Sequence, residues 1–333
     1  MIGVIVLTFR SSDVIEACLE SLRVSDYPDL RVVVCDNASP DDTVAVIRDW
    51  ARSRDVELVE TGPNPDPAPD PARFTLLHTG GNLGFAGGVN AGLRLLLEDQ
   101  RVDLFWILNP DSEAPPHTAA AFVRRASEVG PFSLMGGRVS YHEAPRRIQS
   151  DGGRVFPWSG ICQNLNGGLT RQEAVLPDVA SLDFISGANM VASRRFVEHA
   201  GPMVEDYFLY YEEVDWAARR GDLPLAWCAE AEVFHHGGTA IGTGSMTRRP
   251  SPFANYFNYR NRMRFMRRFR PLAMPVSWFL SMLRVIKLFA IGAIDEAWAA
   301  LCGLNGLPPP SSVRTRIAPT DHERAFVMRE CTR

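Results

Sequence analysis

The hydrophobic pattern of the first half of the chain alternates between two periods. Nearly continuous apolar runs rich in Val, Ile and Leu stand at 2–8, 31–37, 74–78 and 103–109, and segments with helical spacing of apolar residues follow them. Continuous apolar runs are typical of strands buried on both faces, and parallel strands need helical crossovers. The pattern therefore predicts an α/β fold with a mostly parallel sheet flanked by helices. The proline-rich segment 62–73 is expected to be an exposed, stiff insertion.

The residues directly after the strands are the first candidates for a site, because open parallel sheets bind ligands beyond the carboxyl ends of their strands. These segments are "TFR" at 8–10, "DNAS" at 36–39, "GGNLGFAGG" at 80–88 and "NPDSE" at 109–113. Each has a plain explanation as well: Asp36 and Asn37 are favoured helix caps, Gly-rich turns often precede helices, and Asn-Pro readily starts a turn. The stronger hypothesis concerns Asp111, because it offers Mg²⁺ or Mn²⁺ an oxygen ligand with Asn109 and Glu113 close by.

The segment "DYFLYYEEVDWAARR" at 206–220 has the pattern of one amphipathic helix, yet three of its four residues from 212 to 215 are acids. Acids near a helix N-terminus stabilise the helix dipole by about 0.3 to 1 kcal/mol without any catalysis. Asp215 lies one turn before Arg219, so an ion pair explains it as well as a site role does. Glu213 shares its helical face with apolar residues, a setting that a solvated acid does not need.

Composition and charge limit the kinds of protein to which this chain can belong. The chain has 333 residues, of which 46% are hydrophobic and 22% charged, enough for one large domain or two smaller ones. A net charge of −4 argues against a nucleic-acid coat. The six cysteines form no CxxC pair and no zinc-like spacing, so a reducing cytosol is expected.

The C-terminal part has a different character. Segment 256–270 interleaves six arginines with aromatic residues, and long apolar stretches follow to 294, interrupted by Arg284 and Lys287. A membrane-spanning helix would bury these two cations, so we expect amphipathic helices at 256–294 that lie in the membrane interface. Packing on the catalytic domain or on a second subunit is the alternative, which leaves a homodimer open. A basic aromatic run also suits single-stranded nucleic acid, but the acidic remainder argues against that partner.

Seven segments occur in an order that resembles a known family. They span roughly residues 2 to 240 and read "VIVLTFRSSDVIEACLESL", "VVVCDNASPDDT", "GGNLGFAGGVNAG", "FWILNPDSE", "FISGANMVASRRFVEHAGPM", "DYFLYYEEVDWAARR" and "AEVFHHGG". Their order resembles the GT-A fold, family 2 glycosyltransferases, particularly the bacterial rhamnosyltransferase and galactofuranosyltransferase-like branch. No single motif decides this; the resemblance rests on all seven in sequence.

The resemblance implies a domain organisation and a location. A GT-A catalytic domain is expected at 1–245, with a nucleotide-sugar half at about 1–130 and an acceptor half at about 131–245. A basic, amphipathic helical extension would follow at 246–310, and a flexible tail at 311–333. The protein is expected in the cytoplasm, peripherally associated with the inner face of the cell membrane.

The resemblance also implies residues that bind the donor. The positions that match the family's nucleotide-sugar contacts are Thr8, Arg10, Asp36, Asn82, Gly84, Phe85 and Asn109. Asp111 matches the metal-binding acid of the family's DxD motif, in which Asn109 replaces the first acid. His235 or His236 could complete the metal shell, and the family's A-x-V-x-H pattern favours His235.

The catalytic acids follow from the same resemblance. Glu213 stands where inverting members carry the general base, although relatives usually have Asp there, while Glu212 and Asp215 are further catalytic candidates. The residues expected near the donor sugar and the acceptor are Ser186, Gly187, Ala188 and Trp216. "SGAN" at 186–189 has an ordinary tight turn as its alternative.

The function that the resemblance implies is an inverting, metal-dependent sugar transfer in cell-envelope or polysaccharide synthesis. The donor would be a dTDP- or UDP-linked sugar, with rhamnose as first choice and galactofuranose as second, and Mg²⁺ or Mn²⁺ as cofactor. The acceptor would be a hydroxyl of a glycan or lipid-linked glycan. One competing class is a Rossmann-type dinucleotide oxidoreductase, against which the missing GxGxxG after the first strand counts. Another is a catalytically inactive, membrane-bound scaffold with the same fold.

Overall fold

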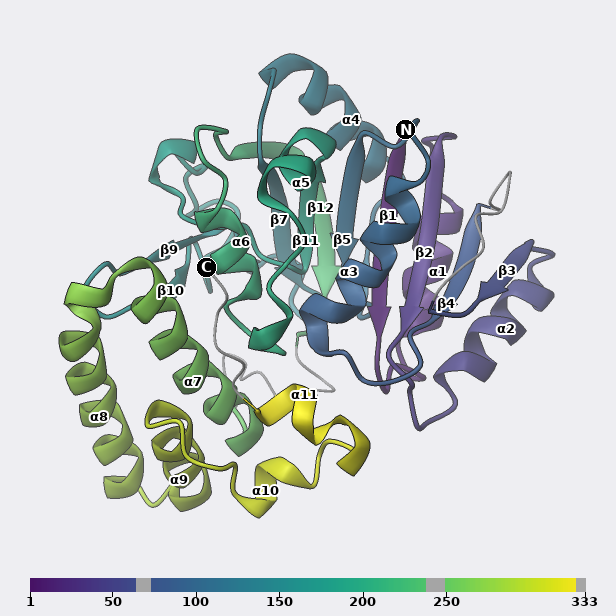
Figure 1. Ribbon diagram of the computed structural model, residues 1–333. Helices are drawn as coiled ribbons and strands as arrows, with labels where there is room; N and C mark the ends of the chain where they lie inside the picture. Colours follow the sequence, from purple (N-terminus) through teal and green to yellow (C-terminus); the bar gives the residue numbers. More distant parts are fainter. Residues whose placement is uncertain (64–72, 238–248, 328–333) are drawn as a thin grey trace.

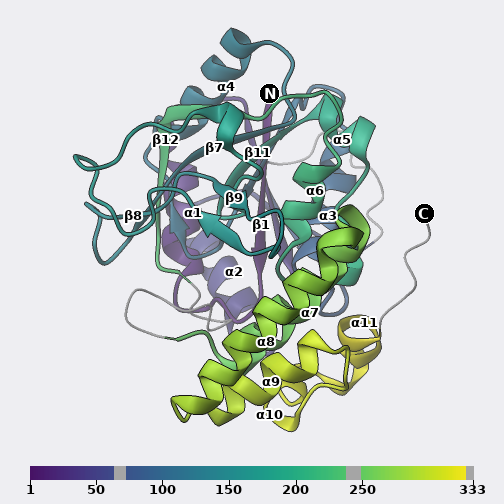
Figure 2. The ribbon, with the colours of Figure 1, turned by 90° about the vertical axis from the view of Figure 1, so that its left-hand side faces the viewer.

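The structure is a computed structural model that describes residues 1–63, 73–237 and 249–327. Most of the proline-rich segment 62–73 and the last six residues, 328–333, therefore lie outside the described part. In the described part, a central sheet is covered by helices on both faces, and a group of C-terminal helices lies at one end (Figures 1 and 2). The expected α/β fold is confirmed.

The central sheet has ten strands in the described residues and runs in the order β3-β4-β2-β1-β5-β11-β7-β12-β6, with β8 paired to β7. The first five along this path are parallel, whereas β11 is antiparallel to both β5 and β7. The strands are β1 (Ile2–Thr8), β2 (Leu30–Asp36), β3 (Leu58–Thr61), β4 (Phe74–His78), β5 (Leu104–Leu108), β6 (Ser112–Glu113), β7 (Leu134–Tyr141), β8 (Ile148–Ser150), β11 (Asn189–Ser193) and β12 (Ala226–His235). A separate pair joins β9 (Gly153–Val155) to β10 (Cys162–Asn164).

Two hydrophobic cores lie on opposite faces of this sheet. Neighbouring residues of β1 alternate between them: Val4 and Val6 enter one core and Ile5 enters the other. The first core is covered by α1 (Ile15–Arg23), α2 (Thr43–Ser53) and α4 (Thr118–Val129), and the second by α3 (Gly84–Leu97), α5 (Arg194–Ala200) and α6 (Glu212–Ala218). Burial on both faces explains the continuous apolar runs of the parallel strands.

The C-terminal helices lie at the end of the molecule where β1 and β2 have their carboxyl ends (Figure 1). They are α7 (Pro252–Phe269), α8 (Met274–Ala290), α9 (Ile294–Leu304), α10 (Ser311–Arg314) and α11 (His322–Phe326). Helices α7 and α9 pack tightly, because a Cβ atom at Gly303 would lie only 2.2 Å from the carbonyl oxygen of Tyr256.

The described residues differ from two expectations for this region. The expected flexible tail forms α10 and α11 in its described part, where Val313, Ile317 and Ala325 are at most 3% exposed in a small core with α7 and α9. Three of the expected lipid-binding arginines, Arg260, Arg262 and Arg264, are at most 6% exposed and face the protein, whereas Arg267, Arg268 and Arg270 are exposed. Arg262 Nε donates to Tyr211 Oη at 3.1 Å and Arg264 Nη1 donates to Asp206 O at 3.2 Å, while the contact of Arg260 is described below with the site.

Candidate active site

One cavity of about 560 Å³ collects most of the sequence candidates at the carboxyl ends of the parallel strands. This volume is in the range of small-molecule sites. The candidates that line it are Arg10, Asn82, Gly84, Phe85, Asn109, Asp111, Ser186, Gly187, Ala188, Glu212, Glu213 and His235. The wall thus combines segments after β1, β4, β5 and β12 with the acidic helix and the C-terminal helices, which complete it from the opposite side.

Thr8 and Asp36 are not part of this lining, so the contacts with base and ribose that we expected for them are not supported. Both side chains are at most 3% exposed. The Thr8 hydroxyl donates to Asp36 Oδ1 at 3.2 Å, and Asp36 Oδ2 accepts from the Ser39 backbone N–H at 3.1 Å. The capping explanation for Asp36 is also wrong, because α2 begins only at Thr43. The pair instead supports the loops beneath the cavity.

Asp111 and His235 face each other in the cavity wall. His235 Nε2 lies 3.0 Å from Asp111 Oδ1 and 3.1 Å from Asn109 Nδ2. On the other side of the ring, Nδ1 lies 2.6 Å from Gln149 Oε1, which directs Nε2 toward Asp111. Although burial opposes ionisation, the neighbouring His235 holds the pKa of Asp111 below its ordinary value. An ionised carboxylate and an oriented imidazole nitrogen form a suitable donor pair for a divalent cation.

The segment before the acids is strained rather than helical, so the expected single helix from 206 is wrong: α6 begins only at Glu212. Phe208, Tyr210 and Tyr211 have φ values of 62°, 67° and 73°. The Leu209 backbone N–H donates to Tyr207 O at 2.7 Å, which closes a tight turn at Phe208. Strained residues of this kind persist only where the surroundings hold them, and they cluster at functional sites.

Helix α7 holds this strained segment in place. The Asn261 side-chain amide donates to the carbonyl oxygens of Tyr207, Leu209 and Tyr210 at 2.8, 2.6 and 3.0 Å. The neighbouring Arg260 also donates to Tyr207 O, at 2.9 Å. Both side chains are at most 4% exposed. The C-terminal region therefore fixes the backbone that carries the acids.

Glu212 and Glu213 both reach the cavity from the first turn of α6. Burial raises the pKa of Glu213 to about 7. Burial, and then the charge of Glu213, raises the pKa of Glu212 well above its ordinary value. Oε2 of each carboxyl group is buried and has no hydrogen-bond partner among the described residues. Glu212 is thus the neutral member of the pair, and Glu213 is the one that ionises near neutral pH.

Asp215 and Trp216 belong to the support of the site and not to its wall. Both are 0% exposed. Asp215 pairs with Arg219 at 2.7 Å and with Arg268 of α7 at 2.9 Å. The Trp216 indole donates to Gly201 O at 2.8 Å. The ion-pair explanation for Asp215 is therefore the right one, and the expected place of Trp216 near the sugar is wrong because the next turn of α6 directs it into the core.

The same family emerges from comparison with known proteins. The profile described as "Glycosyl transferase family 2" matches residues 3–194, which is more than half of the chain. The chain belongs to glycosyl transferase family 2. The oxidoreductase alternative is thereby excluded.

Similar proteins place this glycosyltransferase more closely. It is 24% identical, over 78% of this chain and 74% of the relative, to the low-salt glycan biosynthesis hexosyltransferase Agl10 of Haloferax volcanii. It is 26% identical, over 73% of this chain and 78% of the relative, to the N-acetylglucosaminyl-diphospho-decaprenol L-rhamnosyltransferase of Mycobacterium tuberculosis. The mannosyltransferase PcManGT from Pyrobaculum calidifontis, solved with GDP-Man and Mn²⁺, has a TM-score of 0.51 and 15% identity over 94% of this chain and 77% of its own. That likeness supports the GT-A fold.

The structure adds residues of this glycosyltransferase that sequence reasoning missed. Gln149 orients His235 from β8, and Asn37 lines the cavity and donates to Gly84 O at 2.9 Å. Arg316, which follows α10, also lines the cavity. Nothing in the local sequence marks Gln149 or Arg316, whereas Asn37 stood in a candidate segment but was interpreted as a cap.

Gly84 explains why the glycine-rich segment has this composition. It begins α3 with a φ of +71°, and a Cβ atom there would lie 2.3 Å from Phe208 O. The next residue, Phe85, donates its backbone N–H to the same oxygen at 2.7 Å. The glycine-rich segment therefore contacts the strained segment directly, in addition to lining the cavity.

Proposed function

We propose that this protein is an inverting, metal-dependent glycosyltransferase that moves a sugar from a nucleoside-diphosphate donor to a hydroxyl group of a glycan or lipid-linked glycan. The observation that carries the proposal is the arrangement of one cavity. It places Glu213, which ionises near neutral pH, in the same space as the Asp111–His235 pair. A base for the acceptor and an anchor for the leaving group are the two parts that such a transfer needs.

In this mechanism Glu213 removes the proton from the acceptor hydroxyl while the acceptor oxygen forms its bond to the anomeric carbon. The bond from that carbon to the diphosphate breaks, and the electron pair leaves with the nucleoside diphosphate. Attack from the face opposite the leaving group inverts the configuration. A pKa of about 7 suits this role, because a base is most effective when it ionises near the working pH. Because burial and the charge of Glu213 keep Glu212 neutral, Glu213 is the member of the pair that ionises.

Asp111 and His235 would hold the divalent cation, Mg²⁺ or Mn²⁺, with Gln149 and Asn109 orienting the imidazole. When bound, such a cation neutralises the negative charge that grows on the departing diphosphate. PcManGT was solved with Mn²⁺, and a second GT-A neighbour, GalNAc-T7, was solved with UDP, GalNAc and Mn²⁺. These neighbours support a cation in this protein.

The chemistry of the relatives supports the choice of donor and acceptor. The Mycobacterium tuberculosis relative is named as an L-rhamnosyltransferase that acts on a diphospho-decaprenol-linked sugar. We therefore keep dTDP-rhamnose as the first donor to test, UDP-galactofuranose as the second, and a lipid-linked glycan as the acceptor class.

A donor panel tests the proposed function. The purified enzyme is incubated with dTDP-rhamnose, UDP-galactofuranose and other nucleotide sugars, with Mn²⁺ or Mg²⁺ or with a chelator, and nucleotide release is measured. We expect release from one donor in the presence of the cation, and stabilisation of the enzyme against heat by the matching nucleotide only when the cation is present. Absence of release from every donor, with and without glycan acceptors, would instead support an inactive scaffold.

Arg10 and Arg316 give a prediction about donor affinity. Both guanidinium groups belong to residues that line the cavity, and the charge of Arg10 adds to burial in lowering the pKa of Arg316. Two cations that face one cavity favour an anionic ligand such as a diphosphate. We expect Arg316→Ala to raise the KM for the donor about tenfold or more, the effect of losing one charge-assisted hydrogen bond. Arg314→Ala, an exposed arginine of α10, is the control and should leave the KM unchanged.

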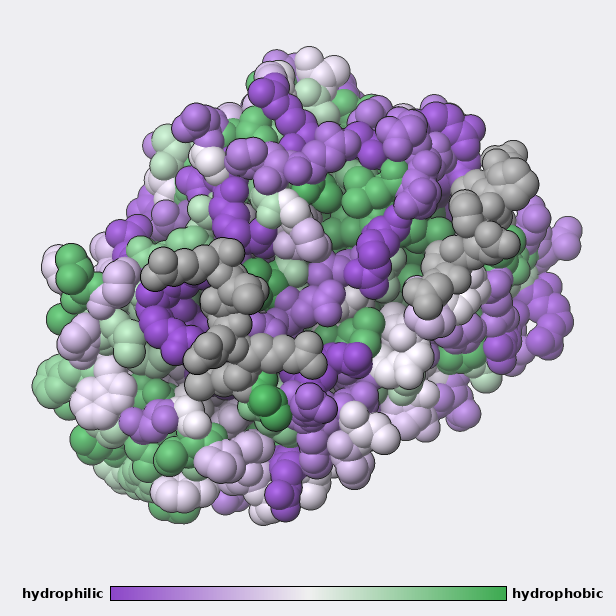
Figure 3. Space-filling model, in the orientation of Figure 1, coloured by the Kyte–Doolittle hydropathy of each residue, from purple (hydrophilic) through white to green (hydrophobic). Residues whose placement is uncertain are grey.

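We further propose that the enzyme lies in the cytoplasm on the inner face of the membrane, and α8 supports the contact with a membrane. Within the described residues, one helical segment, Pro271–Ala290, which consists of a 3-10 turn and α8, is long and apolar enough to cross a membrane; the mean hydropathy of its most apolar 18 residues is 1.5, and only 22% of them are buried. Its exposed residues include Leu272, Phe279, Leu283 and Ile286. Figure 3 shows apolar residues gathered where α8 and α9 lie in Figure 1. Because Arg284 and Lys287 of the same helix are exposed, an interfacial position fits better than a spanning one.

Vesicle binding tests this position. The triple variant Phe279→Ser, Leu283→Ser, Ile286→Ser removes three apolar side chains that are 48 to 56% exposed. Because each side chain buried in lipid contributes up to about 1.5 to 3 kcal/mol, we expect sedimentation with phosphatidylglycerol vesicles to fall at least tenfold. Val175→Ser, at a 78% exposed site far from α8 in sequence, is the control. Unchanged sedimentation of the triple variant would refute the proposed contact.

A further inference from the structure

A second group of metal-ligating side chains lies beside the site already described. Glu113 of β6, His142 directly after β7 and His236 directly after β12 offer ligand atoms that all lie within 4.8 Å of one another. We infer that Glu113, His142 and His236 form a second cation site, distinct from the Asp111–His235 pair, for a divalent transition metal of the Zn²⁺ class. The inference does not depend on the proposed sugar transfer.

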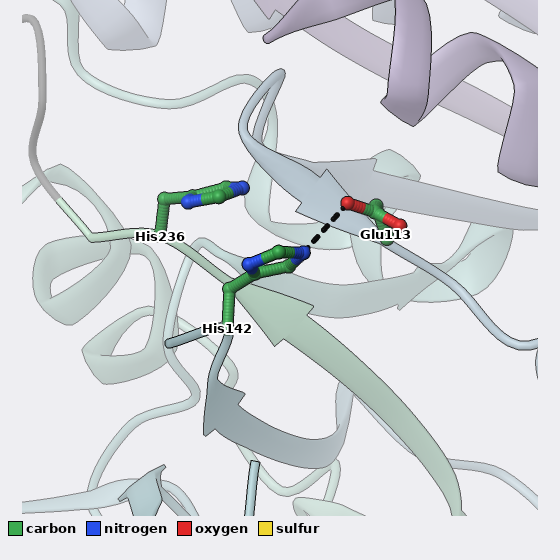
Figure 4. A group of neighbouring side chains, drawn as sticks. All are labelled: Glu113, His142 and His236. Atoms are coloured by element: carbon green, nitrogen blue, oxygen red, sulfur yellow. Dashed lines mark ion pairs between the residues drawn. The ribbon is translucent and has the colours of Figure 1, made fainter. Parts of the chain in front are cut away.

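The geometry of the three side chains favours binding of one metal ion by all of them. Figure 4 shows the two imidazole rings lying one over the other, with a nitrogen of each turned toward Glu113. The ring centroids are 3.8 Å apart with an interplanar angle of 24°, and His142 Nε2 lies 2.9 Å from Glu113 Oε1. Two stacked imidazoles that are turned to one carboxylate supply two nitrogen ligands and one oxygen ligand. This two-His, one-carboxylate set is a known catalytic and binding set for Zn²⁺.

A second carboxylate orients one of the rings. His236 Nδ1 lies 3.1 Å from Glu143 Oε1, so the proton on Nδ1 is held there and Nε2 is left to act as the ligand. Histidines that bind metals usually donate their other ring nitrogen to a carboxylate in this way. The side chains of Glu113, His142 and His236 are 39, 37 and 26% exposed, so an ion from solvent reaches the group without opening the fold.

The strands keep this group separate from the first pair. Neighbouring residues of an extended strand project to opposite faces, so His235 and His236 point to different sides of the chain at the end of β12. Their partners differ accordingly: His235 contacts Asp111, Asn109 and Gln149, whereas His236 contacts Glu143 and stacks on His142.

The backbones of the two groups are nevertheless joined. The His142 N–H donates to His235 O at 3.0 Å, and the His236 N–H donates to Asp111 O at 3.1 Å. A metal ion on the second group would therefore tie the two chain segments that carry Asp111 and His235 to each other and to the segment of His142.

Zinc binding to the full chain tests the inference. The enzyme is stripped with a chelator, and Zn²⁺ is titrated by calorimetry into the background variant Asp111→Asn, His235→Ala, which lacks the first pair. We expect one Zn²⁺ per chain, and an upward shift of Tm of about 5 °C when the free Zn²⁺ concentration is about one hundred times its Kd. Adding His142→Ala or His236→Ala to this background should weaken Zn²⁺ binding at least tenfold. His117→Ala, at an exposed histidine directly before α4 that is not part of the group, is the control and should have no effect.

Two results would overturn the second site. One is a background variant that binds no Zn²⁺ although the wild type does, which would assign the ion to the Asp111–His235 pair. The other is equal Zn²⁺ binding with and without His142 and His236, in variants whose circular dichroism and Tm without metal match the background. Neither result bears on sugar transfer, which the donor panel measures separately.

Discussion

Replacement of Glu213 by Gln is expected to remove sugar transfer almost completely while the protein stays folded. Gln keeps the size of the side chain but cannot accept the proton of the acceptor hydroxyl. General-base catalysis contributes about 10²- to 10⁴-fold, so kcat should fall by that factor, with little change in the KM for the donor. Initial rates with a saturating donor measure the loss. In the wild type, kcat/KM should rise with pH through about 7 and not through the ordinary glutamate value of 4.5.

The same substitution should have the opposite effect on stability. The pKa of Glu213 rises from 4.5 in the unfolded chain to about 7 in the folded protein, because burial favours the neutral acid. The stability that this acid contributes is therefore complete below about pH 4.5 and is lost as the pH rises through 7. Gln has no such loss, so the Tm of Glu213→Gln relative to wild type should increase between about pH 5 and pH 8.

Two control variants distinguish loss of the general base from a general effect of removing an acid. Glu98→Gln, at an exposed acid on the end of α3, should change neither kcat nor the pH dependence of Tm. Asp215→Asn is expected to lower Tm, because Arg219 and Arg268 lose the charge that pairs with both of them. If a folded Asp215→Asn variant lost transfer while Glu213→Gln kept full activity, the base would be assigned to the wrong residue.

Replacement of Asn261 by Asp should disable the enzyme from a residue that touches no substrate. The aspartate would direct a carboxylate oxygen at the three carbonyl oxygens that now accept from the amide, which repels the strained segment before α6. Displacement of a catalytic group by about 1 Å costs on the order of 10²-fold in rate. We expect kcat to fall by about this factor, with a smaller change in the donor KM. Tm should also fall, because one carboxylate oxygen would face the carbonyl oxygens without a donor, while only the other keeps the Arg260 Nε–H.

Asn261→Ala provides a milder version in case the aspartate prevents folding. It removes the donor without adding a charge, so the stability cost should be about 1 to 3 kcal/mol, and kcat should still fall more than KM rises. Asn305→Asp, at the exposed C-terminal end of α9, is the control: it also loses an amide bond to a carbonyl oxygen, that of Leu301, so Tm should fall slightly while kcat stays at the wild-type value. Wild-type kcat and Tm in both Asn261 variants would show that α7 does not hold the acids in position.

Much of this fold follows from local sequence patterns. The strands near the N-terminus are buried on both faces, so their apolar runs are continuous and easy to recognise. Because the carboxyl ends of parallel strands meet at one edge, residues as distant as Arg10 and Asn109 were expected together, and both line the cavity. The proximity of Asp111 and His235 was expected only through the family pattern, since 124 positions separate the two residues and β5 and β12 are not neighbours in the sheet.

The sequence could not predict the strained segment or its support. Helical spacing in "DYFLYYEEVDWAARR" favours one helix, but contacts with α7 and Gly84 keep Phe208, Tyr210 and Tyr211 at positive φ. The arginines of α7 were interpreted as lipid-binding because composition alone does not say whether a cation meets a phosphate or a carbonyl oxygen. Gln149 and Arg316 were missed because only the tertiary arrangement brings them to the cavity.

The hydrogen bonds from α7 to the strained segment limit how far this enzyme can be shortened and stay active. A shortened chain that ends near residue 245 would retain every acid of the cavity. It would lose the amide of Asn261, the guanidinium of Arg260 and the partner that Arg268 provides to Asp215. We expect such a chain to be inactive even if it is soluble. Replacing the exposed apolar residues of α8 is the better route to an active enzyme free of detergent, because α7 and its contacts stay intact.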